Sequence, residues 1–198
     1  TMTIGEYAIA DKIAAFLHQH PEINLHIHYG NTMQLLKLLD RGVLNLVLVE
    51  GNYPKEKYSH KNYSLEDYVA VCAANHKFEL GCPKTLRHLV SERLLVREPG
   101  SGTRNILEEL LLARGMGIKD FKSYVEVENM HTIISLLKRD CGISFMYKIA
   151  VADELKEGSL REILLTDFKM QHDFDFIWEK DSIYTEKYIK ICDEMSNL

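Results

Sequence analysis

The pattern of hydrophobic and polar positions switches repeatedly between the period of a helix and that of a strand. Apolar residues at helical spacing, together with two shorter helical segments that lie between strands, predict seven helices. Their approximate ranges are 4–20, 33–39, 86–89, 105–114, 131–139, 148–156 and 184–195. Short apolar runs predict strands at about 25–29, 44–49, 68–74, 93–96, 124–127, 143–147, 160–167 and 173–178. The polar stretches 52–66 and 75–84 are expected to be irregular. This alternation of strands and helices indicates an α/β fold.

Residues that favour helix ends stand at several of these boundaries. Thr3 and Glu6 have the spacing of a capping box at the start of the first helix. Asn129 is in position to cap the helix over 131–139. The continuous apolar run 44–49 is typical of a strand buried on both faces. Residues 25–49 therefore predict a strand, a helix and a second, parallel strand.

The stretch from Arg97 to Arg104, Arg-Glu-Pro-Gly-Ser-Gly-Thr-Arg, joins an expected strand to an expected helix. Pro99-Gly100 stops the strand, and Ser101 or Thr103 can cap the helix that follows. A helix N-terminus offers free backbone N–H groups and a partial positive charge, so this junction could hold an anionic group. A well-capped helix without a ligand is the alternative, and the local sequence leaves both open.

Composition narrows the class of protein. The chain of 198 residues is 46% hydrophobic and 27% charged, which is ordinary for a globular protein. Its net charge of −5 and pI near 6.0 give no basic footprint for nucleic acid. No apolar run approaches the roughly 20 residues of a membrane span, and no secretory signal opens the chain. The cysteines lack CxxC spacing, so we expect reduced cysteines in a cytoplasmic protein.

Candidate catalytic and metal-binding groups have simpler explanations. His26 and His28 share one face of an expected strand, but without a placed carboxylate or cysteine a solvated face is favoured over a metal site. Ser101 has no marked general base, and its surroundings match neither a nucleophile elbow nor a P-loop. Cys72 and Cys141 are interpreted as small core residues rather than a redox switch. We expect no catalysis, no metal and no cofactor.

Several motifs, in order, resemble the effector-binding domain of LysR-type transcriptional regulators. The segments that carry the resemblance are TMTIGEY at 1–7, HPEINL at 20–25, GNT at 30–32, GVLNL at 42–46, VEG at 49–51, REPGSGTR at 97–104, CGIS at 141–144 and ELKEGSL at 154–160. Each motif is weak alone. Their shared order and spacing cover nearly the whole chain.

The resemblance implies an α/β fold of two Rossmann-like lobes of the type II periplasmic-binding-protein kind, hinged by two crossover strands. Lobe I would comprise residues 1–70 and 170–198, and lobe II residues 71–169. A small polar effector with a carboxylate or another anionic group would bind in the cleft between the lobes. The family's N-terminal winged helix-turn-helix is absent from these residues, so DNA would be contacted only through a domain outside this chain.

Carried over position by position, the resemblance assigns eight effector-binding residues: Thr1, Thr3, Asn31, Thr32, Ser101, Gly102, Thr103 and Asn129. Ser101 and Thr103 would take the anionic group with their hydroxyl and backbone N–H groups. Thr1 and Thr3 would approach from the other lobe. Glu50 could favour an effector that also carries an amine, or could be a solvated residue.

The chain departs from the family pattern at a few positions. The family places a strand immediately before Thr1, and Asn45 replaces the usual Asp. Asn129 and Met130 stand where a small hydroxyl residue is common, and Tyr147 stands where Pro is common. These changes would alter the size or polarity of the ligand, so the identity of the effector is left open.

Two functions follow from the resemblance. The preferred one is the effector-sensing domain of a bacterial, cytoplasmic LysR-type regulator that forms a homodimer or a higher homo-oligomer and does not contact membranes. The alternative is a free-standing solute-binding protein of a transport system with the same fold. An enzyme on this scaffold is a third class, but the sequence marks no acid–base pair.

Overall fold

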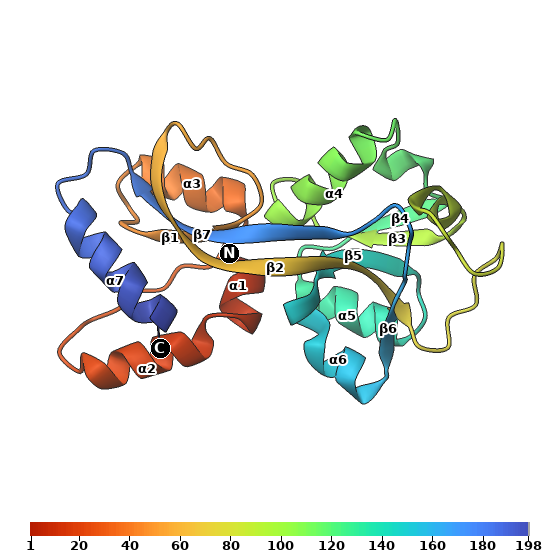
Figure 1. Ribbon diagram of the computed structural model, residues 1–198, viewed down its shortest axis with the longest axis horizontal. Coiled ribbons are helices and arrows are strands. Elements are labelled where there is room, and N and C mark those ends of the chain that lie inside the picture. Colours follow the sequence, from red (N-terminus) through yellow and green to blue (C-terminus); the bar gives the residue numbers. More distant parts are fainter. Residues whose placement is uncertain (198) are drawn as a thin grey trace. The chain divides into compact units, whose positions relative to one another are not determined.

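The computed structural model describes residues 1–197, and Asn197 by its backbone alone. The chain divides into two compact units: unit 1 comprises Thr1–Leu65 and the residues from Asp173 onward, and unit 2 comprises Glu66–His172. Two long strands, β2 (Tyr58–Ala73) and β7 (Met170–Glu179), each run from one unit into the other (Figure 1). The mixture of helices with a mixed sheet confirms the α/β class expected from the sequence.

Unit 1 packs helices against a short antiparallel pair of strands. β1 (Val47–Glu50) pairs with the second half of β7, and Glu50 lies opposite Phe174. α3 (Thr32–Asp40) packs on β1, because its apolar stripe joins a core made of Leu35, Leu39, Val47, Val49, Tyr53, Tyr58 and Ile177. α2 (Ala10–Gln19) and α7 (Thr185–Asn197) lie side by side (Figure 1).

Unit 2 is built on a sheet in the order β4-β3-β5-β2. β3 (Arg93–Val96) pairs in parallel with β4 (Ser123–Glu126) and with β5 (Ile143–Tyr147), whereas β2 is antiparallel to β5. β6 (Leu160–Glu162) also pairs with β2. α4 (Gly102–Leu112) lies on one side of this sheet, and α5 (Met130–Lys138) and α6 (Ala152–Glu157) lie on the other (Figure 1). Short 3-10 helices cover Leu86–Ser91, Ile118–Asp120 and Lys148–Val151.

The strand expected at 25–29 is wrong. The segment between α2 and α3 forms no strand in the described chain, and its side chains Ile23, Leu25, Ile27 and Tyr29 are 36%, 45%, 49% and 54% exposed. Alternating apolar residues predict a strand only if a neighbouring strand supplies hydrogen bonds, and none of the strands described in residues 1–197 pairs with this segment. The parallel crossover expected over 25–49 is therefore wrong as well.

The single helix expected over 4–20 is also wrong, because the chain forms two helices, α1 (Met2–Tyr7) and α2, separated at Ala8 and Ile9. Both Ile4 and Ile9 are buried, and the N–H of Ile9 donates to the carbonyl of Ile4 at 3.1 Å, which turns the chain between the helices. The capping box expected from Thr3 and Glu6 is not formed, since Thr3 lies inside α1.

The loop expected over 52–66 is partly a strand, because β2 already begins at Tyr58. From Ser59 to Tyr63 its side chains alternate between half-buried and exposed positions, as a strand requires. The amide of Asn62 donates to Asp173 at 2.9 Å and to Asp175 at 3.2 Å, both on β7. Polar contacts between neighbouring strands thus stabilise a segment whose composition resembles that of a loop.

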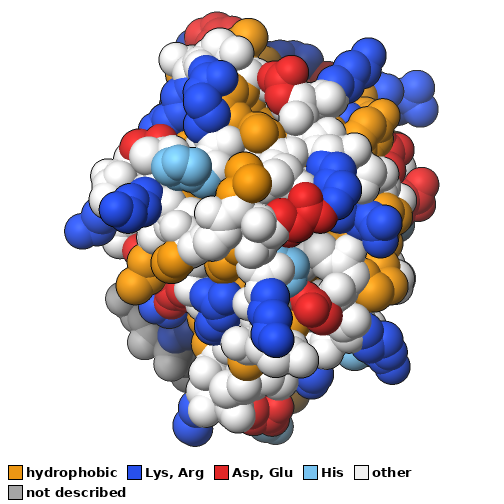
Figure 2. Space-filling model, turned by 90° about the vertical axis from the view of Figure 1, so that its right-hand side faces the viewer, with side chains coloured by type: hydrophobic (Ala, Val, Ile, Leu, Met, Phe, Trp, Pro, Cys, Tyr) orange, Lys and Arg blue, Asp and Glu red, His pale blue; other side chains and the backbone are white. Residues whose placement is uncertain are grey.

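The face of the molecule drawn in Figure 2 is mixed in charge. On the face drawn in Figure 2, Lys and Arg side chains are interspersed with Asp and Glu and with small groups of hydrophobic side chains.

Within residues 1–197, every helix is too short or too polar to span a membrane.

We expect Gly142→Ala to reduce the stability of unit 2 strongly. Gly142 has φ of +152°, and a Cβ at this position would overlap the backbone carbonyl oxygen of Arg93. Strain and overlap together are expected to lower the free energy of unfolding by about 2–4 kcal/mol in urea denaturation. The control is Gly158→Ala, which has φ of +74° but no atom within 4 Å of its added Cβ, and should cost about 1 kcal/mol. Equal losses for the two variants would contradict the close approach at Gly142.

Candidate functional site

The junction of β3 and α4 forms the strand–turn–helix that the sequence predicts. β3 ends at Val96, Gly100 takes a positive φ of +92°, and α4 begins at Gly102, three residues earlier than expected. The turn is closed by a hydrogen bond from the N–H of Ser101 to the carbonyl of Glu98 at 3.2 Å. The backbone at the start of α4 is therefore held in a fixed conformation.

The hydroxyl of Ser101 is the most unusual group in this turn. Ser101 occupies the N-cap position of α4, yet its side chain makes no capping hydrogen bond, so the cap expected from the sequence is wrong. Ser101 is 2% exposed, and its Oγ has no hydrogen-bond partner in the described part of the chain. Buried polar groups are normally paired, and an unpaired one costs about 1–3 kcal/mol. A bound molecule at the start of α4 would remove this cost.

Side chains from neighbouring elements hold the carbonyl groups around Ser101. The hydroxyl of Tyr68 donates to the carbonyl of Thr103 at 2.8 Å, and Thr103 is itself only 1% exposed. The guanidinium of Arg104 donates to the carbonyl of Arg97 at 3.0 Å. The residues Ser101, Gly102 and Thr103, which the sequence predicts to bind the effector, thus lie together at the start of a braced helix.

Both arginines of the turn are paired with carboxylates. Arg97 donates to Glu98 through Nε at 2.8 Å and through Nη2 at 3.1 Å. Arg104 donates to Glu108 at 2.8 Å and to Glu126 at 2.6 Å. Burial acts to lower the pKa of Arg104, but the hydrogen bonds to the two glutamates outweigh burial and raise it. The turn therefore carries fixed, paired charges.

In unit 1, three of the predicted residues form hydrogen bonds with Glu50, which is 1% exposed, and two of them reach its carboxylate. The hydroxyls of Thr1 and Thr3 donate to its two oxygens, each at 3.0 Å, and the hydroxyl of Thr32 donates to its backbone carbonyl at 2.9 Å. We call this group the Glu50 cluster. Glu50 is therefore a buried, hydrogen-bonded carboxylate, and the interpretation of this residue as solvated is wrong.

The backbone nitrogen of Thr1 adjoins the same cluster. It donates to the carbonyl of Leu48 at 2.8 Å, on β1.

The two predicted asparagines cap helices. The side-chain oxygen of Asn129 accepts a hydrogen bond from the N–H of Thr132 at 2.9 Å, so the cap expected at the start of α5 is confirmed. Asn31 accepts from the N–H of Gln34 at 3.0 Å, and the side chain of Gln34 accepts from the N–H of Asn31 at 3.0 Å, which completes a capping box on α3. Helix capping explains both residues without a ligand.

Three polar residues outside the predicted set belong to these sites: Glu50, Arg97 and Asn105. Nη1 of Arg97 and Oδ1 of Asn105 are buried and, like Oγ of Ser101, have no hydrogen-bond partner among the described residues. Arg97 lies inside the motif that the sequence singles out, but nothing in the local pattern reveals that its side chain is buried. The burial of Glu50 could be inferred only from its position directly after an apolar strand.

Other candidate groups gain no function from the structure. His26 and His28 are exposed, and no three His, Cys, Asp or Glu side chains in residues 1–197 are grouped to hold a metal ion. Burial raises the pKa of the Cys72 thiol to about 11 and that of Cys192 to about 12, so both thiols are protonated and unreactive at neutral pH. Cys72 is a core residue of β2, as expected.

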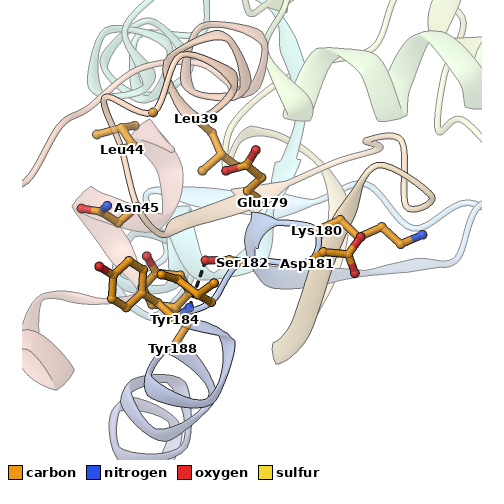
Figure 3. Close-up of a pocket in the computed structure, with 11 residues that line it drawn as sticks. Leu39, Leu44, Asn45, Glu179, Lys180, Asp181, Ser182, Tyr184 and Tyr188 are labelled. Carbon is orange, nitrogen blue, oxygen red and sulfur yellow. Dashed lines mark hydrogen bonds between the residues drawn. The ribbon is translucent and has the colours of Figure 1, made fainter.

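A depression of about 360 Å³ opens in unit 1 between α3 and the segment that links β7 to α7 (Figure 3). Its lining residues are Leu39, Gly42, Leu44, Asn45, Glu179, Lys180, Asp181, Ser182, Ile183, Tyr184 and Tyr188. This lining includes none of the eight predicted residues. Ser182 is engaged locally, since its hydroxyl accepts from the N–H of Tyr184 at 3.3 Å (Figure 3).

We expect Glu50→Ala to destabilise unit 1, because it leaves the buried hydroxyls of Thr1 and Thr3 without their acceptors. The free energy of unfolding should fall by about 2–4 kcal/mol in urea. Glu50→Gln keeps one acceptor oxygen and should cost about half as much. Glu157→Ala, at an exposed position on α6, is the control and should change stability by less than about 0.5 kcal/mol. A loss for Glu50→Ala no larger than the control's would contradict the cluster.

Comparison with known proteins identifies relatives over most of the chain. The family model of the LysR substrate binding domain matches residues 1–188. The uncharacterized HTH-type transcriptional regulator YeiE of Escherichia coli (strain K12) is 28% identical over 161 residues, covering 81% of this chain and 54% of YeiE. The HTH-type transcriptional activator CmpR of Synechocystis is 26% identical over 181 residues, covering 91% of this chain and 58% of CmpR. The chain thus spans little more than half the length of these relatives.

Solved structures share the fold. The regulatory domain of Synechocystis CcmR in complex with 2-PG superposes with a TM-score of 0.82 at 17% identity, covering 96% of this chain and 91% of that domain. The sulfate-bound regulatory domain of a Vibrio vulnificus OxyR2 mutant has a TM-score of 0.81 at 15% identity, covering 99% and 92%. The expected fold of the type II periplasmic-binding-protein kind is confirmed. Because the family model covers nearly the whole chain, this chain belongs to the LysR substrate-binding domain family and is an effector-binding domain of the LysR type.

Proposed function

We propose that this chain senses a small polar effector whose anionic group binds at the start of α4, and that binding alters DNA-binding domains carried by the full-length regulator. The observation that supports this most directly is the hydroxyl of Ser101, which is buried at the N-terminus of α4 without a partner in the described chain. A hydroxyl that capped its helix would have no need of a ligand.

The chemistry of the helix start favours an anion. α4 is 11 residues long, so its N-terminus carries a partial positive charge and backbone N–H groups that lack partners within the helix. Ser101 adds a hydroxyl donor at the same position. Among the similar structures, the regulatory domain of OxyR2 is described as bound to sulfate, which is an anion, and that of CcmR as bound to 2-PG.

The unit 1 residues Thr1, Thr3, Asn31 and Thr32 are retained as proposed effector contacts, as is Asn129 of unit 2. The hydroxyls of Thr1 and Thr3 already donate their protons to Glu50, so towards an effector they would act as acceptors. An effector that contacts them would therefore have to offer hydrogen-bond donors as well as an anionic group.

The role as a regulator is favoured over the alternatives. The relatives YeiE and CmpR are named transcriptional regulators, so a solute-binding protein for transport is not favoured. For the same reason we propose a role without catalysis, in the cytoplasm, where such a regulator reaches DNA through a separate domain.

A thermal-shift screen of the 198-residue chain with sulfate, acetate, glycine and benzoate tests this function. A probe at about one hundred times its dissociation constant should stabilise the chain by about 2.7 kcal/mol, which corresponds to a rise in Tm of about 5–10 °C. Ser101→Ala and Thr103→Ala should each reduce the shift. Ser91→Ala, at the other end of β3, is the matched control and should leave it unchanged. Shifts that are unaffected by Ser101→Ala, or no shift with any probe, would refute the proposed site.

We also propose that the chain forms a homodimer or a higher homo-oligomer, as the family resemblance implies. Light scattering at a concentration of about 100 μM should then give at least twice the chain's mass of 22.9 kDa. A monomeric mass over the whole range of concentration would contradict this proposal.

A further inference from the structure

We propose that Nη1 of Arg97, Oγ of Ser101 and Oδ1 of Asn105 form one ligand subsite, and that its ligand is a small carboxylate with a hydrogen-bond donor on the neighbouring carbon. This inference rests on the proposed function and adds two residues and a ligand class to it. All three atoms are buried and lack partners among the described residues.

The three residues come from one short stretch of the chain. Arg97 follows β3, Ser101 is the N-cap of α4, and Asn105 lies one helical turn further, where its N–H donates to the carbonyl of Ser101 at 3.0 Å. Asn105 is therefore tied to Ser101 by the first hydrogen bond of α4, within one turn of the helix start. In the proposed subsite, one small molecule with polar groups on adjacent carbons contacts both Ser101 and Asn105.

The side chain of Arg97 is prepared to bind an oxyanion. It is 3% exposed, and two of its nitrogens are held by the carboxylate of Glu98 at 2.8 Å and 3.1 Å. This pairing fixes the planar guanidinium and leaves Nη1 as a buried donor. A buried donor on a charged group gains most from an acceptor that is itself charged.

The unpaired atom of Asn105 needs a hydrogen-bond donor from the ligand, whereas Arg97 needs an acceptor. Oδ1 is an acceptor only, so its partner must be a donor such as a hydroxyl or an ammonium group. The hydroxyl of Ser101 can donate to the carboxylate or accept from the donor group. A carboxylate alone would leave Asn105 unpaired, whereas a 2-hydroxy or 2-amino acid would satisfy all three residues.

The charges around the start of α4 favour a ligand with a single negative charge. Arg97 and Arg104 supply the positive charges, and both are already paired, with Glu98, Glu108 and Glu126. The carboxylates thus outnumber the guanidinium groups by one. A ligand with one negative charge therefore meets less repulsion from these side chains than a dianion such as sulfate, and the partial positive charge of the helix N-terminus offsets part of that repulsion.

Calorimetric titration of the 198-residue chain with acetate, glycolate and glycine tests the subsite. Glycolate or glycine should bind about tenfold more tightly than acetate, since each adds a donor for Asn105. Asn105→Leu should remove this preference without changing the affinity for acetate. Arg97→Lys keeps the charge beside Glu98 but loses the planar fork, and should weaken all binding about tenfold. The difference in affinity between glycolate and glycine distinguishes a hydroxyl donor from an ammonium donor.

Matched controls separate local from general effects. Arg93→Lys lies at the start of β3 and Asn75→Leu in an exposed turn of unit 2, and neither should change binding. Circular dichroism and Tm of every variant establish that it is folded. If Ser101→Ala weakens glycolate but Arg97→Lys and Asn105→Leu do not, the subsite is refuted while the proposed function stands. If none of the three changes binding, or if no probe binds below about 10 mM, both are refuted.

Discussion

The pairing of buried polar groups is the constraint on which the start of α4 depends. The carbonyls of Leu95, Arg97 and Thr103 accept hydrogen bonds from Ser144 on β5, Arg104 on α4 and Tyr68 on β2, at 2.7, 3.0 and 2.8 Å. Side chains from three elements thus fix the path of the backbone from β3 into the helix. Because these carbonyls are satisfied within unit 2, the unpaired Ser101 hydroxyl stands in a rigid frame, and a ligand would meet it already oriented.

In unit 1 the need to pair a buried polar group is met within the chain itself, at Glu50. The carboxylate of Glu50 is as deeply buried as Ser101, but the hydroxyls of Thr1 and Thr3 occupy both of its oxygens. A buried charge without such partners would be far more costly. The threonines are therefore held in place by a requirement of the fold, and any role they have in binding follows from that placement.

Local signals in the sequence were sufficient where the structure depends on neighbours in the chain. Asn129 caps α5 as expected, because an N-cap needs only the N–H groups two or three residues ahead. The strand–turn–helix at 97–104 was predicted for the same reason. The resemblance to a family added the arrangement of the whole chain, which no local pattern contains.

Prediction failed where a residue's environment comes from distant parts of the chain. Residues 25–29 alternate like a strand but have no described strand beside them, so their apolar side chains are exposed. For Glu50 the sequence leaves two alternatives, a contact to an amine and a solvated residue, because the hydroxyls that bind it lie 47 and 49 residues earlier. Ser101 looked like a helix cap, and only the fold reveals that its hydroxyl is buried and uncapped.

The free-energy cost of leaving these buried polar groups without hydrogen bonds has the magnitude that a sensor needs. A ligand changes the balance between two conformations only by the difference in its free energy of binding to them. Each buried, unpaired polar group at the start of α4 costs about 1–3 kcal/mol until a partner arrives. The coupling free energies of allosteric proteins are typically about 1–3 kcal/mol as well. Satisfying even one of the three groups in a single conformation would therefore supply a bias of the magnitude that regulation requires, without any larger change in the fold of unit 2.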